Sequence, residues 1–128
     1  MILNYEFSNP VKINELFRPI LQLLALRDVV NFKLLIDGIA DLILISFKEI
    51  DIEVTSSLNK DNIIFQVELN IEEAIGYLVF NNIVIMKKNS NDETLELTEI
   101  GKLHIQSEEP IKFYDNKRNL RYILDFLP

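Results

Sequence analysis

The stretch of residues 83–97 constrains the fold of this chain more than any other part of its sequence. Residues 83–86 are apolar at every position, which is typical of a strand covered on both faces. A polar run of seven residues, 87–93, follows, and apolar and polar side chains then alternate from Leu95 to Thr98. This order predicts an antiparallel hairpin whose solvated tip is the polar run.

Helices are predicted on both sides of this hairpin. Before it, Asn70 can cap a helix over residues 71–81, because its side chain can accept the free amides of the first turn. The stripe expected to face inward consists of Ile71, Ala74, Ile75, Leu78 and Val79. After the hairpin, Thr98 can cap a helix from Glu99 to about Ser107, in which Gly101 is expected to pack closely against a neighbour.

Two more helices are predicted nearer the N-terminus. The first begins at Ser8-Asn9-Pro10 and contains Pro19, which predicts a kink or a break because proline has no amide hydrogen to donate. Its expected apolar face consists of Ile13, Leu16, Phe17, Ile20, Leu21 and Leu24. The second helix is expected to be capped by Asn31, with Leu34, Leu35, Ile39, Leu42, Ile43 and Ile45 facing inward.

The remaining segments are predicted to form two strands and a closing helix. Residues 50–54 and 65–69 each alternate between apolar and polar side chains, which indicates a pair of strands joined by the turn-rich residues 56–62. Residues 116–127 are expected to form the last helix, with Leu120, Ile123, Leu124 and Leu127 on one face.

Apart from the central strand pair, the predicted order is helix, helix, helix, hairpin, helix, which is the order of a winged helix. We therefore predict an α+β fold, a winged-helix-like domain with extra N- and C-terminal helices. No repeat or linker divides the chain, so residues 1–128 are expected to form a single domain. The most apolar stretch, residues 34–47, is too short to cross a bilayer roughly 30 Å thick, and no membrane attachment is expected.

The chain contains no cysteine, which excludes disulfides, thiolate zinc sites and cysteine nucleophiles. Its first residues show no basic region followed by an apolar one, as a secretory signal would. Both features favour a cytoplasmic protein.

Groups that could carry catalysis are sparse. The chain has one histidine, His104, and only three glycines, so neither a catalytic triad nor a glycine-rich phosphate loop is visible. Asp51 and Glu53 could share one face of a strand, which leaves a metal-dependent hydrolase as a third hypothesis, but no lysine follows closely to complete such a site. We expect a protein that is not an enzyme and that needs no cofactor or metal.

The formal charge of −7 argues against strong binding to nucleic acid, which depends on lysine and arginine displacing phosphate counterions. Residues 70–109 carry three basic and eight acidic side chains, whereas residues 110–128 carry four and two. Local contacts to a nucleic-acid backbone could come from Lys87 and Lys88 in the hairpin, and from Lys117, Arg118 and Arg121 in the last predicted helix. Contact with nucleic acid is therefore expected to be weak or indirect, and a solvated surface is the simpler explanation of these five side chains.

The helix over residues 71–81 occupies the place where a DNA-binding winged helix would enter the major groove. Its outward positions carry Glu73 and a neighbouring glutamate, which would repel phosphates, and no basic residue. Tyr77 and Phe80 are three residues apart and can lie side by side on this outward face. An aromatic pair with few charges is typical of a protein interface, so Tyr77, Phe80 and Glu73 are the predicted partner interface. The alternative is that Tyr77 and Phe80 pack beneath a neighbouring helix.

Several segments together resemble the middle component of bacterial ABC-three-component systems. They are Phe7-Ser8-Asn9-Pro10 before a helix with Leu16, Arg18 and Leu21, the helix over residues 31–42, residues 72–101, and Phe113-Tyr114 before a last helix containing Arg121. Residues 46–69 depart from the pattern. The resemblance implies an accessory subunit that docks on an SMC- or RecF-like ABC ATPase, beside an effector subunit, in defence against phages or mobile elements.

Two functions follow as expectations. The first is a non-catalytic interaction subunit of a larger ABC ATPase complex. The alternative is a winged-helix transcriptional regulator that binds DNA, which allows a homodimer.

Overall fold

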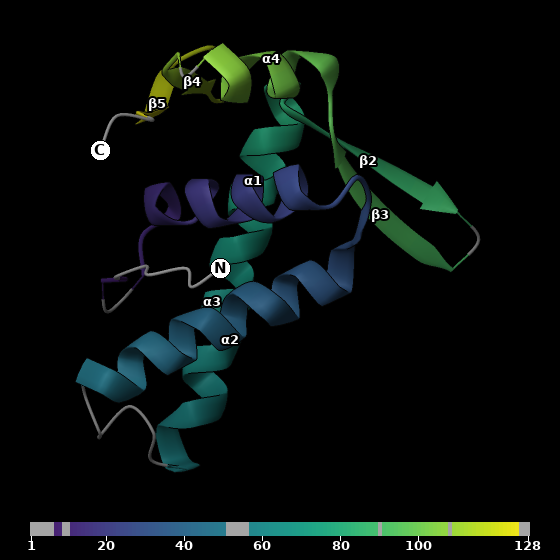
Figure 1. Cartoon of the computed structure of the whole chain (residues 1–128). Coiled ribbons are helices and arrows are strands. Elements are labelled where there is room, and N and C mark those ends of the chain that lie inside the picture. The colour runs from purple at the N-terminus through teal and green to yellow at the C-terminus, as the bar shows by residue number, and fades with distance from the viewer. Residues whose placement is uncertain (1–6, 9–10, 51–56, 90, 108, 126–128) are drawn as a thin grey trace.

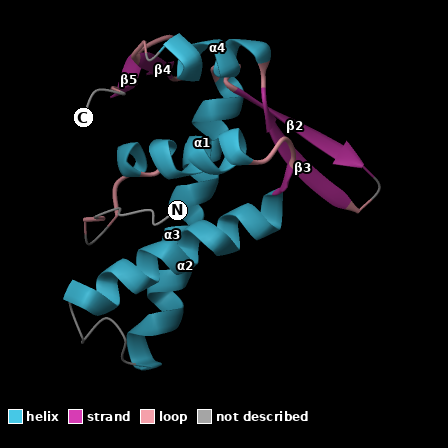
Figure 2. Cartoon of the chain, in the orientation of Figure 1, coloured by secondary structure: helices cyan, strands magenta, loops and turns pink. Residues whose placement is uncertain are grey.

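The computed structural model describes residues 7–8, 11–50, 57–89, 91–107 and 109–125, and side chains within them except at residues 46–50 and 57–63. The fold is α+β, with four α-helices, one short 3₁₀ helix and two small antiparallel sheets in the described part (Figure 2). In chain order the elements are the 3₁₀ helix Ile13–Glu15, α1 Phe17–Leu26, β1 Val30–Asn31, α2 Phe32–Ile50, α3 Ser57–Phe80, β2 Val84–Asn89, β3 Asp92–Leu97, α4 Glu99–Ser107, β4 Ile111–Tyr114 and β5 Leu120–Leu124. None of the described helices is long and apolar enough to cross a membrane.

The long helix α3 is the element around which the others are arranged. Helices α1 and α2 cross it on one side, and the two hairpins lie near its C-terminal end (Figure 1). The core forms where these helices meet the sheet, and its fully buried side chains include Phe17, Leu35, Ile71, Leu78 and Leu95. The inward faces predicted for α1 and for the second half of α3 are confirmed, with Ile13 and Val79 only partly buried at their edges.

Helix α1 begins later than predicted. Ser8 does not cap it: a 3₁₀ turn precedes α1, and the residue at the N-cap of α1 is Leu16. The backbone amide of Ser8 donates to the Glu15 carboxylate at 2.7 Å. Pro19 is the third residue of α1. In the first turn a helix has no acceptor for an amide hydrogen, so proline is tolerated there. Of the predicted kink or break, the structure shows a break, and it lies at Leu16, before Pro19.

Helix α2 begins as the sequence predicts. The backbone amide of Leu34 donates to Asn31 Oδ1 at 3.1 Å, which confirms the cap. Ile39 and Ile43 are buried as expected, but Leu34 is 68% exposed and Ile45 55% exposed. Because successive helical residues are rotated by about 100°, Leu34 and Ile45 lie on the side of α2 opposite the buried residues. The prediction that these two side chains face inward is therefore wrong.

The predicted strand over residues 65–69 is wrong, because these residues lie inside α3. The partner strand was expected at residues 50–54; Ile50 is the last residue of α2, and residues 51–54 lie outside the described part of the chain. Val67 continues the helical spacing of the buried stripe of α3, whereas Phe65 on the opposite side is 64% exposed. The alternation of apolar and polar residues over these five positions is therefore too short to indicate a strand.

Asn70 lies in the middle of α3 and is not its cap. Its side-chain amide donates to the carbonyl of Val11 at 3.2 Å, which ties α3 to the segment before α1. The same side chain accepts a hydrogen bond from Gln66 one turn earlier.

The first sheet has the strand order β1-β3-β2, all antiparallel. Strands β2 and β3 pair from Val84 with Leu97 to Asn89 with Asp92, so the paired strands include most of the polar run that was predicted to be the tip. Lys87 and Lys88 consequently belong to β2. Beyond Val84 the strand is exposed on its outer side, so the prediction that it is covered on both faces is wrong for the next two residues.

Helix α4 is capped as predicted. The backbone amide of Gly101 donates to Thr98 Oγ1 at 2.9 Å, and the Thr98 amide donates to the carbonyl of Ile83 at 3.0 Å. Gly101 packs so closely that a Cβ atom there would lie 2.2 Å from the Ile83 carbonyl oxygen. The expected close approach of this glycine is confirmed.

The closing helix predicted over residues 116–127 is wrong, because the described part of this segment forms a turn and strand β5. Strand β4 alternates between buried and exposed side chains and pairs with β5. Arg118 adopts the left-handed conformation, with φ 64°, in the turn between them. Of the four leucine and isoleucine positions expected on one helical face, Leu124 is buried, Leu120 and Ile123 are exposed, and Leu127 lies outside the described residues.

Candidate functional site

The candidate site lies where the C-terminal end of α3 meets the turn between β4 and β5. Asn81, just after α3, holds the two segments together. Its side-chain amide donates to the carbonyl of Tyr114 at 3.1 Å and to that of Tyr77 at 2.9 Å, and its Oδ1 accepts the backbone amide of Tyr114 at 3.0 Å. The hairpin is thereby fixed against the last turn of the helix.

Beneath this junction four aromatic rings pack together. Phe17 of α1 stacks on Phe113 of β4 with ring centroids 4.1 Å apart. Tyr122 of β5 meets Tyr77 edge to face at 5.2 Å, and both tyrosines approach Phe17 in the same manner. Such contacts fix ring orientations as well as burying apolar area, so Tyr77 is held in place from below.

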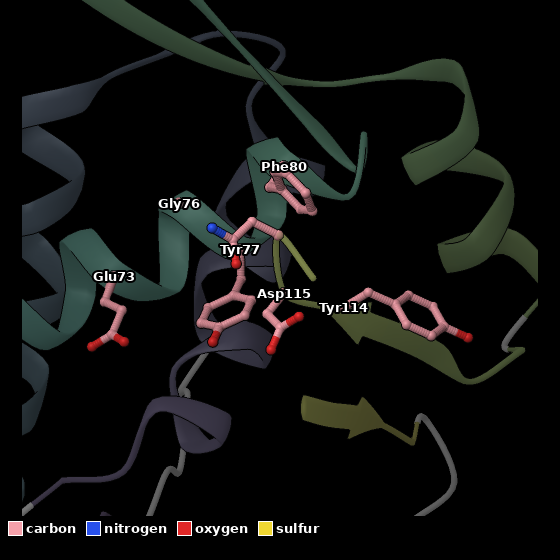
Figure 3. A pocket seen from close by; sticks show the side chains of 7 residues that line it. Glu73, Gly76, Tyr77, Phe80, Tyr114 and Asp115 are labelled. Atoms are coloured by element: carbon pink, nitrogen blue, oxygen red, sulfur yellow. The ribbon is translucent and has the colours of Figure 1, made fainter. Parts of the chain in front are cut away.

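Above the rings lies an open groove of about 340 Å³. Its lining residues are Glu73, Gly76, Tyr77 and Phe80 from α3, and Tyr114, Asp115 and Asn116 from β4 and the turn after it. In Figure 3 the Glu73 and Asp115 carboxylates lie on either side of the Tyr77 ring and point the same way as its hydroxyl, while Phe80 lies on the last turn of α3. We refer to these seven residues as the α3–β4 groove.

The groove brings together Tyr77, Phe80 and Glu73, which sequence analysis selected as the partner interface. The alternative was that both aromatic side chains pack beneath a neighbouring helix, and neither side chain is fully buried in this way. Tyr77 is half-buried on the aromatic cluster, and Phe80 is 56% exposed.

Four lining residues were not selected from the sequence: Gly76, Tyr114, Asp115 and Asn116. Tyr114, Asp115 and Asn116 could have been selected only if the β4–β5 hairpin had been predicted. The alternation over residues 111–114 followed by Asp-Asn is a strand-and-turn signal, since aspartate and asparagine favour turns. A helix was expected there instead.

Two carboxylates give the groove its electrostatic character. Asp115 Oδ1 accepts the backbone amides of Lys117 and Asn119, both at 2.9 Å, so its orientation is set by the turn. Glu73 is exposed, and neither carboxylate forms an ion pair with a residue that the structure describes. Basic residues are absent from the groove lining.

The negative potential extends to Tyr122. Burial raises the pKa of the Tyr122 hydroxyl above its usual value, and the proximity of Tyr77 and Glu73 raises this pKa further. The positive charge of Arg121 acts in the opposite direction and lowers this pKa.

The five basic residues considered as nucleic-acid contacts do not form one surface. Lys87 forms an ion pair with Glu96 of the adjacent strand, and Lys88 lies opposite Glu93 in the register of the same hairpin. Lys117, Arg118 and Arg121 lie in the turn between β4 and β5 and in β5, not on a helix. The two hairpins extend from different sides of the molecule (Figure 1).

Within the described ranges, no three histidine, aspartate or glutamate side chains come close enough together to hold a metal ion. His104 is half-buried in α4. Asp51 and Glu53, the basis of the hydrolase hypothesis, lie outside the residues that the structure describes.

Comparisons of the chain with protein-family models, with curated proteins and with solved structures give no match.

Proposed function

We propose that this chain is a non-catalytic accessory subunit that docks on a larger protein through the α3–β4 groove. The observation that carries the proposal is the convergence of Glu73, Tyr77 and Phe80 with Tyr114 at one concave, solvent-facing place. An aromatic side chain that is more than half exposed beside a pocket gains free energy when a partner covers it. Interfaces of this kind depend on a few such anchors.

The fold that we propose for this role is a winged-helix variant. The order helix, short strand, helix, helix, hairpin, together with the strand order β1-β3-β2, supports it. Helix α3 then occupies the place of a recognition helix. Its exposed Glu72 and Glu73 suit a protein partner better than the phosphates of DNA.

The partner that we propose is an SMC- or RecF-like ABC ATPase, with an effector subunit in the same cytoplasmic complex. The resemblance of residues 72–101 and of the N-terminal segments to the middle component of ABC-three-component systems supports this choice. Defence against phages or mobile elements is the corresponding biological role.

Affinity purification from the source cells, with nuclease treatment and mass spectrometry, tests the proposal. We expect wild-type protein to recover one large coiled-coil ATPase. Phe80→Ala should lose most of it, because truncating a buried interface anchor costs about 2 kcal/mol or more.

Phe65→Ala is the matched control, because Phe65 is also a largely exposed phenylalanine on the same helix and lies outside the groove. Equal recovery by wild-type and Phe80→Ala protein, or loss only in Phe65→Ala, would contradict docking through the groove.

A further inference from the structure

The α3–β4 groove combines two kinds of group that attract a cation. Carboxylates come from Glu73 on α3 and from Asp115 in the turn after β4. Neither is neutralised by an ion pair with a described residue. A partner lacking positive charge would have to desolvate both without compensation, which is costly.

Aromatic rings supply the second kind of group. Tyr77, Phe80 and Tyr114 all line the groove, and the face of an aromatic ring attracts a cation placed over it. The Tyr77 ring meets Phe17 and Tyr122 edge to face, so its orientation in the groove is fixed. A cation seated there would have the two carboxylates on either side of the ring (Figure 3).

The chain's own cations do not fill this place. Lys117, Arg118 and Arg121 are close in sequence to the groove, but none lines it. Arg121 lies near Tyr122, which is not a lining residue. No described cation lines the groove, so the complementary charge is left to another molecule.

Among protein side chains, arginine matches this combination best. Its guanidinium is planar, so it can stack on an aromatic ring while its five N–H donors reach carboxylates in the ring plane. Lysine carries its charge at one strongly hydrated point and stacks less well.

We propose that the α3–β4 groove is an arginine-binding site, which receives one arginine side chain of the partner protein. The inference rests on the proposed docking function and adds the chemistry of the anchor. A guanidinium over Tyr77, between Glu73 and Asp115, pairs both carboxylates and leaves Phe80 to cover the aliphatic part of the side chain.

The first test needs no partner. Nα-acetyl-arginine amide is titrated into ¹⁵N-labelled protein, and the amide signals of Gly76, Tyr77 and Asn116 are followed by NMR. We expect saturable shifts at these signals with a dissociation constant on the order of millimolar. Nα-acetyl-citrulline amide, which has the same shape without the charge, should produce no saturable shift, and Nα-acetyl-lysine amide should bind more weakly than the arginine compound.

Two neighbouring variants make the test specific. Glu73→Gln should weaken binding of the arginine compound about threefold, the size expected for losing one exposed ion pair. Glu72→Gln removes the same charge one residue away, outside the groove lining, and should leave the affinity unchanged.

The proposal is overturned if citrulline binds as well as arginine, if lysine binds equally, if no signal saturates, or if both glutamate variants weaken binding equally. Affinity purification separates this inference from the docking function. If Phe80→Ala loses the ATPase while Glu73→Gln keeps it in full, the groove docks a partner without an arginine anchor. If the arginine compound binds and no ATPase is recovered, the arginine site stands and the docking function fails.

Discussion

Gly101 is the residue whose environment leaves least room for change. A Cβ atom there would meet the Ile83 carbonyl oxygen at 2.2 Å, and that oxygen also accepts the Thr98 amide at the start of α4. We predict that Gly101→Ala lowers the free energy of unfolding by about 1–3 kcal/mol, the range of overpacked cores. Urea denaturation followed by circular dichroism measures the change.

Gly38→Ala in the interior of α2 is the control, because nothing lies within 4 Å of a Cβ atom at that position. This variant should be more stable than wild type by about 1 kcal/mol, since alanine favours a helix more than glycine does. Equal stability of the two alanine variants would contradict the close contact between α4 and Ile83.

Tyr122 is the residue whose ionisation reports on the groove. Its raised pKa means that the fold favours the neutral phenol. The stability that this preference contributes is present below about pH 10, the usual tyrosine value, and is lost as the pH rises through the higher pKa of the folded state. We predict that the rise in absorbance at 295 nm with pH includes a late step from Tyr122, and that Tyr122→Phe removes this step.

The same titration tests the position of Glu73. Its negative charge disfavours the Tyr122 phenolate, so Glu73→Gln should move the late step to lower pH. A late step that survives in Tyr122→Phe protein would assign the shift to another tyrosine.

At the scale of elements, Asn81 joins helix α3 to the β4–β5 hairpin through both backbone groups of Tyr114. We predict that Asn81→Ala lowers the free energy of unfolding by about 1 kcal/mol, the usual net contribution of hydrogen bonds at an exposed site, because the two hydrogen bonds to the Tyr114 backbone are lost. Amide hydrogen exchange at Tyr114 should also become faster, since its acceptor is lost. Asn89→Ala on the exposed β2 strand is the control and should change stability by less than about 0.5 kcal/mol. Equal exchange rates of the Tyr114 amide in both variants would show that Asn81 does not hold the hairpin against α3.

The elements that could be predicted from the sequence are those with long or sharply marked patterns. The buried stripe of α1, the Asn31 cap of α2 and the Thr98 cap of α4 follow from local chemistry that leaves few alternatives. The β2–β3 hairpin was placed correctly, but its strands are longer than expected. The ladder includes the polar residues Lys87 and Lys88, and Lys87 forms an ion pair with Glu96.

The failures concern segments whose pattern fits both helix and strand. Residues 65–69 alternate, yet they lie inside helix α3, which packs against α2 and is tied to Val11 by Asn70. Residues 116–124 have apolar side chains at helical spacing, but Asp115 closes a turn and β5 pairs with β4. Both outcomes depend on contacts between distant segments, which local spacing does not contain.

Of the two walls of the candidate site, only the one formed by α3 could be predicted from the sequence. Tyr77, Phe80 and Glu73 were found because their outward positions follow from the stripe on α3, which was recognised correctly. Tyr114, Asp115 and Asn116 were missed with the hairpin that carries them. A concave site needs both walls, so the groove itself could not be predicted.

At the scale of the whole molecule, the charge distribution opposes binding to DNA. The exposed face of α3 carries Glu72 and Glu73, and the five basic residues considered as nucleic-acid contacts are divided between two separate hairpins. We predict that duplex DNA binds more weakly than about 10⁻⁴ M at physiological salt, the weak end of non-specific binding. Tighter binding that falls steeply with salt, and that Lys117 and Arg118 charge-removal variants abolish, would support the transcriptional regulator instead.

Docking through the α3–β4 groove is tested most directly by site-specific photo-crosslinking in the source cells. The photoreactive amino acid p-benzoyl-phenylalanine replaces Phe80 in one protein and Phe65 in another, and the crosslinked products are identified by mass spectrometry. Both positions are exposed on α3, but only Phe80 lines the groove. We predict one crosslinked ATPase from position 80 and none from position 65; a crosslink from position 65 alone, or from neither position, would contradict docking at this groove.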